Sequence, residues 1–279
     1  MKMLYFSIAA ISLTSSQALV IDHAQSLHPP NAGLTISQRP QDVNLTQFGI
    51  WSPRIENCPQ PYTIRLETTL ESVKQRIDRA IAELRVRVIR DDNEKRRQAS
   101  FKSYQYLPFL LERLVDIANV RPIDGLKPHK EILQTPHLAC VSPESSQKYA
   151  WLHLGYDPWT VCKTEPFPRT FLVPHSAYIF VCPHFFSFSP EGITDRCPAV
   201  VDNRFVGNEG EYYADSQVYG ILAQLYRFYL QGQAIDTPPL DWNECILDLT
   251  PRESILRPKN VALWTFFVHN KCGVFPQRG

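Results

Sequence analysis

The chain has 279 residues, of which 44% are hydrophobic and 20% are charged. Its formal net charge at pH 7 is +1, which excludes a strong field toward nucleic acid or an anionic membrane surface. The apolar content is sufficient for the core of one large domain or two small ones. We therefore expect neither nucleic acid nor a membrane as a partner.

The first eighteen residues, MKMLYFSIAAISLTSSQA, have the features of a secretory signal peptide. Lys2 gives a basic start, an apolar core follows, and small residues end at Ala18. The apolar core is about a dozen residues long, too short for a permanent membrane anchor. The sequence thus predicts a secreted, extracellular protein with a signal peptide at residues 1–18.

Residues 19–54 contain several prolines and few periodic apolar positions. This composition predicts an extended N-terminal arm or a pro-segment. The sequon Asn-Leu-Thr at Asn44 lies within it and predicts an N-linked glycan. Residues 55–279 are then expected to form the folded domain.

The domain begins with helical patterns. Apolar side chains recur at steps of three and four from Leu66 to Val88, which predicts one long amphipathic helix. A dense charge run of mixed sign, Arg90 to Gln98, indicates a solvated helix end. A second helical run spans Leu107 to Val120.

The middle of the chain is rich in β-forming residues. The segments HLACVS, AWLHLG and SAYIFVCPHFFSF are short and bounded by Pro, Gly and Ser, which is typical of strands. They predict a small sheet.

The chain has seven cysteines, and in a secreted protein these favour disulfides over metal ligands. Because the number is odd, at least one thiol stays free or pairs with another chain. We expect bridges between Cys182 and Cys197 and between Cys245 and Cys272, because each pair brackets one compact block.

Helices return in the last third. The segment DSQVYGILAQLYRFYLQG predicts a buried helix with Asp215 or Ser216 as its N-cap and Gly232 just past its end. A last helix is expected from Lys259 to Cys272. The order of helices, small sheet and helices predicts an α+β fold.

Common catalytic motifs are missing. The sequence has no Gly-x-Ser-x-Gly, no Walker loop and no Gly-x-Gly-x-x-Gly. No two of its eight histidines are four residues apart, so no helix presents two imidazoles to one metal ion. We therefore predict no cofactor, except zinc if the chain carries an unconventional site gathered from scattered loops.

Four blocks together resemble a known family. They are ENCPQPYTIRLETTLESVKQRIDRAIAEL, AYIFVCPHFFSF, YGILAQLYRFYL and DWNECILDLTPRESILRPKNVALWTFFVH. In order and spacing, from Cys58 to Cys272, they resemble the fungal secreted aspzincin metallopeptidases, the deuterolysin and peptidyl-Lys metalloendopeptidase group. The resemblance implies a zincin-like fold, helical with a small disulfide-braced sheet.

The resemblance also implies where the chemistry should lie. In the family, two His of His-Glu-x-x-His and a downstream Asp hold zinc, the Glu is the general base, and a downstream Tyr assists the oxyanion. Aligning ILAQLYR on the family's LLHELTH puts Ala223 and Arg227 at the two His positions and Gln224 at the Glu position. The downstream segment places Thr237 at the Asp position and Leu240 at the Tyr position.

None of these replacements can do the family's chemistry. Ala has no lone pair for a metal, and Arg is a permanent cation. Gln cannot take up a proton at neutral pH. The sequence thus predicts a degenerate member that lacks the zinc motif.

Three functional hypotheses follow from the sequence. The first is a secreted, catalytically inactive metallopeptidase homologue that binds an extracellular protein or peptide. The second is an active metalloendopeptidase with an unconventional zinc site, for example one gathered from His137, His153 and His184. The third is a disulfide-stabilised structural or cell-wall-associated protein.

Overall fold

The structure is a computed structural model, and it describes residues 53–86, 91–123, 135–152, 154–164, 169–173, 176–188, 197–206, 216–235 and 242–276. The chain divides after Gln47, and every described residue lies in the second unit, Phe48–Gly279. The predicted signal peptide, nearly all of the predicted arm and the sequon at Asn44 lie outside the described residues.

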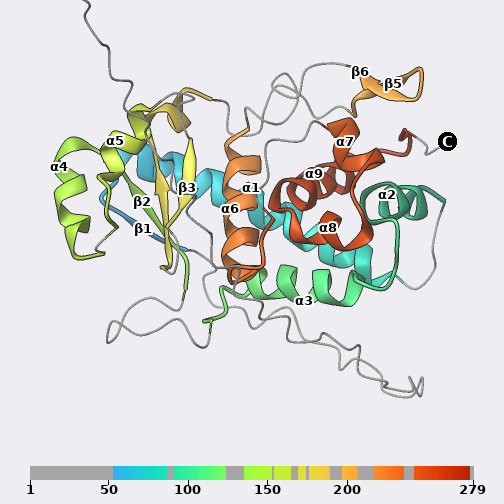
Figure 1. The fold of residues 1–279 in the computed structure, drawn as a ribbon, viewed down its shortest axis with the longest axis horizontal. Helices are drawn as coiled ribbons and strands as arrows, with labels where there is room; N and C mark the ends of the chain where they lie inside the picture. The colour runs from blue at the N-terminus through green and yellow to red at the C-terminus, as the bar shows by residue number, and fades with distance from the viewer. Residues whose placement is uncertain are drawn as a thin grey trace, which may run out of the picture. The chain divides into compact units, whose positions relative to one another are not determined.

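A four-stranded sheet has the order β1-β2-β4-β3 (Figure 1). Strands β1 (Arg54–Glu56), β2 (His137–Cys140) and β4 (Tyr178–Val181) are parallel, and β3 (Thr170–Leu172) runs antiparallel to β4 at one edge. Every residue of β2 and β4 is buried. Both faces of these central strands are therefore covered, which explains their continuous apolar sequences.

The two faces of the sheet pack against different layers. Side chains alternate between the faces along a strand, so Leu138 and Ile179 face the main core, whereas Ala139 and Phe180 face a smaller one. The smaller layer is built from α4 (Pro143–Ser146), the 3-10 helix η2 (Gln147–Leu152) and α5 (Pro158–Lys163).

The main core is helical. It includes α1 (Gln60–Arg85), α2 (Asp91–Phe101), α3 (Leu107–Ala118), α6 (Gln217–Tyr229), α7 (Trp242–Leu247), α8 (Pro251–Leu256) and α9 (Pro258–His269). Helix α9 is buried along nearly its whole length and packs against both α1 and α6. A 3-10 helix, η3 (Pro183–Ser187), follows β4, and β5 (Ala199–Val201) and β6 (Arg204–Val206) form a separate two-stranded ribbon. The predicted mixed fold, helical with a small sheet and disulfides, is confirmed.

One predicted strand is wrong. The segment AWLHLG begins within η2 and forms no strand in its described residues. Just before it, Ser142 caps α4 by accepting a hydrogen bond of 3.0 Å from the Ser145 backbone N–H. Since η2 follows α4 without a break, this local capping overrides the β propensity of the aromatic and aliphatic side chains.

The predicted disulfide pairs are also wrong. The structure forms three bridges, which are Cys58–Cys140, Cys162–Cys182 and Cys197–Cys272. Helix α5 brings Cys162 to the end of β4, so Cys182 does not pair with Cys197. The tail after α9 brings Cys272 to Cys197 across 75 residues, so Cys245 stays a free, buried thiol. Proximity in sequence was therefore a poor guide to proximity in space.

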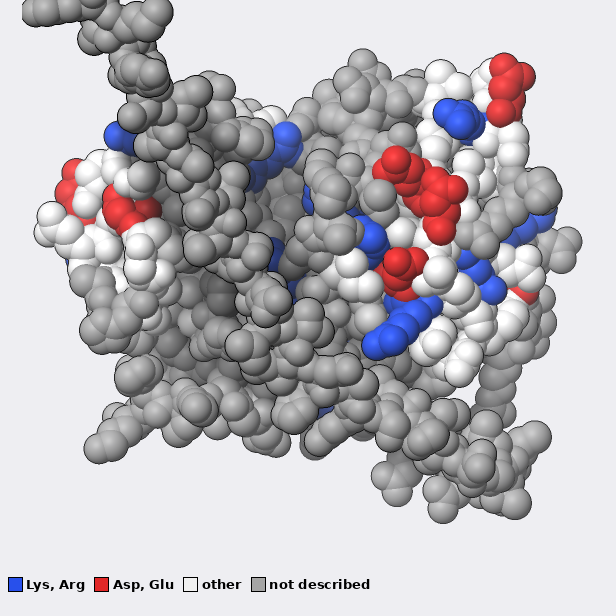
Figure 2. All heavy atoms as spheres, viewed as in Figure 1, with Lys and Arg blue, Asp and Glu red and all other residues white. Residues whose placement is uncertain are grey.

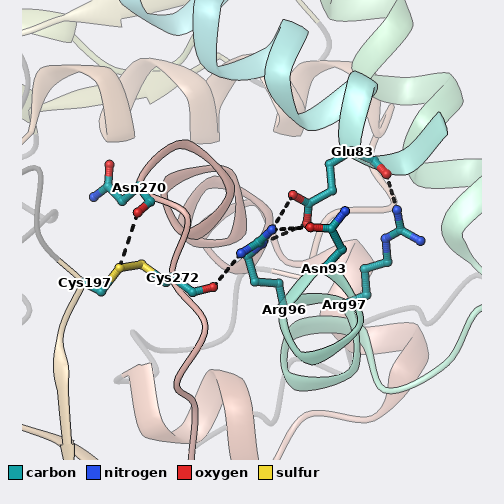
Figure 3. A network of polar contacts seen from close by, with 7 residues as sticks. All are labelled: Glu83, Asn93, Arg96, Arg97, Cys197, Asn270 and Cys272. Atoms are coloured by element: carbon teal, nitrogen blue, oxygen red, sulfur yellow. Dashed lines mark hydrogen bonds and ion pairs between the residues drawn. A yellow bond between two sulfur atoms is a disulfide. The ribbon is translucent and has the colours of Figure 1, made fainter. Parts of the chain in front are cut away.

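The charge run Arg90 to Gln98 is not simply solvated. Its described part lies in α2, where Arg96 and Arg97 are only 4% and 5% exposed. Arg96 donates two hydrogen bonds, of 3.0 and 2.9 Å, to the carboxylate of Glu83 (Figure 3). The prediction of a solvated helix end is thus wrong for these two arginines, because α1 supplies a buried carboxylate to Arg96 and a backbone carbonyl to Arg97, both from Glu83.

Elsewhere the described surface has mixed charge. Figure 2 shows basic and acidic side chains interspersed on the described part of the face that it draws. None of the helices in the described ranges is long and apolar enough to cross a membrane.

Candidate functional site

Helix α6 carries the positions that the sequence singled out. Its N-cap is Ser216, whose hydroxyl accepts from the Tyr219 backbone N–H at 3.3 Å. Ser216, one of the two predicted caps, is therefore confirmed in that role. Most residues of the helix are buried, so its position in the fold is fixed by packing rather than by propensity.

A buried glutamine fixes the first turn of α6. The Gln217 side-chain amide donates to the carbonyls of Phe185 and Phe188 at 3.1 and 2.8 Å. Its oxygen accepts from the Thr69 hydroxyl of α1 at 3.1 Å. These bonds join α6 to α1 and to the segment after β4, which places the helix beside the sheet.

The three positions that the resemblance aligns with a zinc motif lie three and four residues apart, on one side of α6. Ala223 is 7% exposed, and Gln224 and Arg227 are half-buried. The Gln224 amide donates to the backbone carbonyl of Thr170 in β3 at 3.3 Å. Helix α6 packs against β3 (Figure 1). These three side chains do not fit a zinc ion, because one has no donor atom, one is a cation and the third is bonded to the backbone.

Strand β3 is an edge strand, so one row of its backbone N–H and C=O groups points away from the sheet. Its hydrogen bond from Val173 N–H to the Tyr178 carbonyl is 2.9 Å long. In an antiparallel pair, residues that bond to the partner strand alternate with residues that do not. Phe171 therefore also bonds to β4, whereas Thr170 and Leu172 turn their backbone N–H and C=O groups outward. On this outer edge the Thr170 carbonyl accepts from Gln224.

The histidines proposed for an unconventional zinc site do not converge. His137 lies at the start of β2, whereas His184 lies in η3, after the end of β4. Because β2 and β4 are parallel and in register, these residues lie toward opposite ends of the sheet. His153 lies outside the described residues. Within the described ranges, no three His, Cys, Asp or Glu side chains gather as a metal site would require.

His137 instead belongs to a polar cluster on the other face of the sheet. Its Nδ1 lies 2.9 Å from the Glu56 carboxylate, which also accepts from the Tyr178 hydroxyl at 3.2 Å. Burial lowers the pKa of His137, and the hydrogen bond to Glu56 offsets this only in part. Since the side chain of His137 is almost fully buried, this cluster joins β1, β2 and β4 rather than offering a base to a substrate.

Two tyrosines on α6 are core residues. The Tyr226 hydroxyl donates to the Ile255 carbonyl at 2.9 Å, and the Tyr229 hydroxyl donates to the Arg121 carbonyl at 3.0 Å. Burial raises the pKa of both phenols. They therefore anchor α6 to its neighbours, with their polar tips satisfied.

Two positions expected downstream, Thr237 and Leu240, lie outside the described residues. The sequence also missed the two arginines of α2 described above. No local signal marks them, because the carboxylate that accepts from Arg96 lies in another helix, thirteen residues away along the chain.

No protein-family model matches the sequence, and no curated protein sequence matches it. Among solved structures, the chain is similar to a zinc peptidase from Grifola frondosa. The two share 11% sequence identity with a TM-score of 0.46, over 75% of this chain and 97% of that chain.

Proposed function

We propose that this protein is a secreted, catalytically inactive metallopeptidase homologue that binds an extended segment of an extracellular protein or peptide. One observation carries the proposal. Gln224, at the position of the family's general base, bonds to the edge strand β3 instead of facing a metal-bound water. The replaced helix thus serves to hold a strand whose outer edge points away from the sheet.

The side chains at the other two positions support the loss of catalysis. Ala223 is buried and offers no ligand atom, and Arg227 brings a positive charge to the former ligand position. A catalytic zinc site needs about three protein ligands and a carboxylate to take a proton from water. Neither requirement is met on α6.

The outer edge of β3 supports binding. Beyond the carbonyl that Gln224 covers, Leu172 presents an outward N–H and C=O, which form no hydrogen bond with the described residues. The residues of β3 are half-buried, and the open backbone edge of such a strand can pair with an extended chain without a metal. The short length of β3 limits the pairing to a few backbone hydrogen bonds.

The three disulfides support an oxidising, extracellular location, since such bridges persist mainly outside the cytosol. They join β2 to the segment just before α1, α5 to the residue after β4, and the tail to the segment before β5.

The first test addresses catalysis. We expect the purified protein, after dialysis against a zinc buffer, to carry far less than one zinc per chain by mass spectrometry. We also expect it to leave casein uncut. Stoichiometric zinc with casein cleavage would establish the active metalloendopeptidase and overturn the proposal.

The second test addresses the strand edge. Peptides selected from a random display library for binding are titrated against the wild type and two variants. Leu172→Pro removes the outward N–H without breaking a bond to β4, and Leu172→Ala keeps the N–H but trims the side chain. We expect a larger loss of affinity for Leu172→Pro. Equal affinity of all three proteins would rule out pairing at this edge.

A further inference from the structure

A second site lies among the helices, where α2, α7 and the C-terminal tail line a pocket of about 650 Å³. Its lining comes from the second half of α2 and the turn after it, from Ile246 of α7, and from the tail Gly273–Pro276. Pockets of this size hold small organic ligands. None of these residues belongs to α6 or to the sheet.

The walls of this pocket are fixed in place. The tail is tied by the Cys197–Cys272 disulfide, and Arg96 Nη1 donates to the Cys272 carbonyl at 2.7 Å (Figure 3). Gly273 lies so close to α2 that a Cβ atom on it would come 3.1 Å from the Asp92 carboxylate. Since Arg96 also bonds to Glu83 of α1, the tail, α2 and α1 form one connected unit.

The described lining of the pocket carries positive charge. Lys95, Arg97 and Lys102 line it, and no Asp or Glu is among its described lining residues. Within the described ranges, the Glu83 carboxylate pairs with Arg96, whereas Arg97 bonds only to the Glu83 backbone carbonyl. The Nε atom of Arg97 is buried without a hydrogen-bond partner in the described part of the chain. A buried guanidinium without a carboxylate is costly unless an anion approaches it.

At least three carboxylates lie near the pocket without lining it, and one of them, Glu94, accepts a hydrogen bond of 2.9 Å from the side-chain amide of Gln98, which does line it. Asp92 adjoins Gly273. Hydrogen bonds from Thr250 lower the pKa of Glu253 most, and the nearby charge of Lys102 lowers it further. The Glu253 carboxylate accepts from the Thr250 backbone N–H at 2.9 Å as part of the cap of α8. Its negative charge is thus already engaged by a helix terminus.

The remaining lining is amphipathic. Ser103 and Tyr104 offer hydroxyl groups beside the cations, and Ile246, Val274 and Phe275 offer apolar surface. Three cations in one pocket match an anion of more than one negative charge, and hydroxyl donors add hydrogen bonds to its oxygens. The apolar residues match a hydrocarbon or aromatic body attached to that anion.

We propose that this pocket binds a phosphate monoester, with the phosphate among Lys95, Arg97 and Lys102 and the organic group against Ile246 and Phe275. This site is independent of the strand edge of β3.

The probe is phenyl phosphate, titrated into the protein with its disulfides intact by calorimetry at low ionic strength. Inorganic phosphate tests the anion alone, benzyl alcohol tests the ring alone, and phenyl sulfate tests a singly charged oxyanion. We expect phenyl phosphate to bind most tightly, inorganic phosphate and phenyl sulfate more weakly, and benzyl alcohol not measurably. Binding of benzyl alcohol as tight as that of phenyl phosphate would overturn the charge argument.

Variants then locate the site. We expect Lys95→Gln to weaken phenyl phosphate binding on the order of ten-fold, as for loss of one charge-assisted contact. Asp92→Asn removes a nearby negative charge and is expected to tighten binding a few-fold. Lys148→Gln, an exposed lysine on the other side of the sheet, is the matched control and is expected to change nothing. Equal affinity of Lys95→Gln and wild type would overturn the proposal.

A measurement on the unmodified protein keeps the test independent of folding defects. Phenyl phosphate is expected to shift the backbone amide signals of Ser103, Tyr104 and Val274 in a nitrogen–proton correlation spectrum. Shifts confined to other parts of the chain, or no shifts at millimolar ligand, would show that this pocket binds no such anion.

Discussion

The side-chain amide of Gln224 donates a hydrogen bond to the backbone carbonyl of Thr170, 3.3 Å away, and so joins helix α6 to the edge strand β3. An acid at this position could not donate that bond while ionised. An amide at position 224 can donate this hydrogen bond but cannot act as a general base. An ionised carboxylate could act as a base but could not donate the bond.

This relationship predicts the behaviour of Gln224→Glu. At pH 7 one oxygen of the new carboxylate would lie against the Thr170 carbonyl oxygen, and the two would repel each other. The other oxygen would occupy the site of the present Oε1 atom, which is buried without a hydrogen-bond partner among the described residues. We expect a loss of about 1–3 kcal/mol in the free energy of unfolding, measured by urea titration. At pH 4 a protonated Glu can donate again, so the loss relative to wild type should shrink. A loss that is the same at both pH values would argue against this contact.

Introducing a His-Glu-x-x-His zinc motif into α6 is not expected to produce a working metal site. The triple variant Ala223→His, Gln224→Glu, Arg227→His places an imidazole at a position that is 7% exposed. Overpacking of this kind costs about 1–3 kcal/mol, and the ligands need supporting contacts that this helix does not supply. We expect zinc content below one ion per chain by mass spectrometry and little casein cleavage. Strong peptidase activity in the variant would mean that the rest of a zinc site is intact.

The disulfide between Cys197 and Cys272 is expected to contribute strongly to stability. It closes a loop with a sequence separation of 75, so Cys197→Ser should lower the free energy of unfolding by about 2–5 kcal/mol. Cys245→Ala, which removes the buried free thiol, is the control and is expected to cost on the order of 1 kcal/mol. Peptide mapping without reduction checks the connectivity, and a Cys245–Cys272 peptide would contradict it.

Burial of His137 predicts a loss of stability in acid. Its pKa in the folded state is below the ordinary value of 6.5, so the unfolded chain binds the proton first as the pH falls. The free energy of unfolding should therefore decrease below about pH 6.5, until the folded imidazole also protonates. We expect His137→Gln, which keeps a donor for Glu56, to show a flatter dependence between pH 7 and pH 5. An unchanged pH dependence in His137→Gln would contradict this assignment.

The sequence by itself determined the elements that depend on local pattern. The apolar stripe of α1 is buried at Leu66, Leu70, Val73, Ile77 and Ile81, as a helical period requires. The strands β2 and β4, the cap at Ser216 and the helices α3, α6 and α9 also follow from short-range signals. The presence of at least one unpaired cysteine also follows from the sequence, because seven cysteines cannot all pair within one chain.

Only the tertiary structure decided which distant groups meet. The partner of Cys182 is Cys162 rather than Cys197, and the carboxylate that neutralises Arg96 comes from α1. Gln224 meets β3 because Gln217 and the buried tyrosines fix α6 beside the sheet. The physical reason is common to all three. Each contact joins chain segments that are separated in sequence, and its energy depends on burial and geometry that arise only when the helices and the sheet pack together.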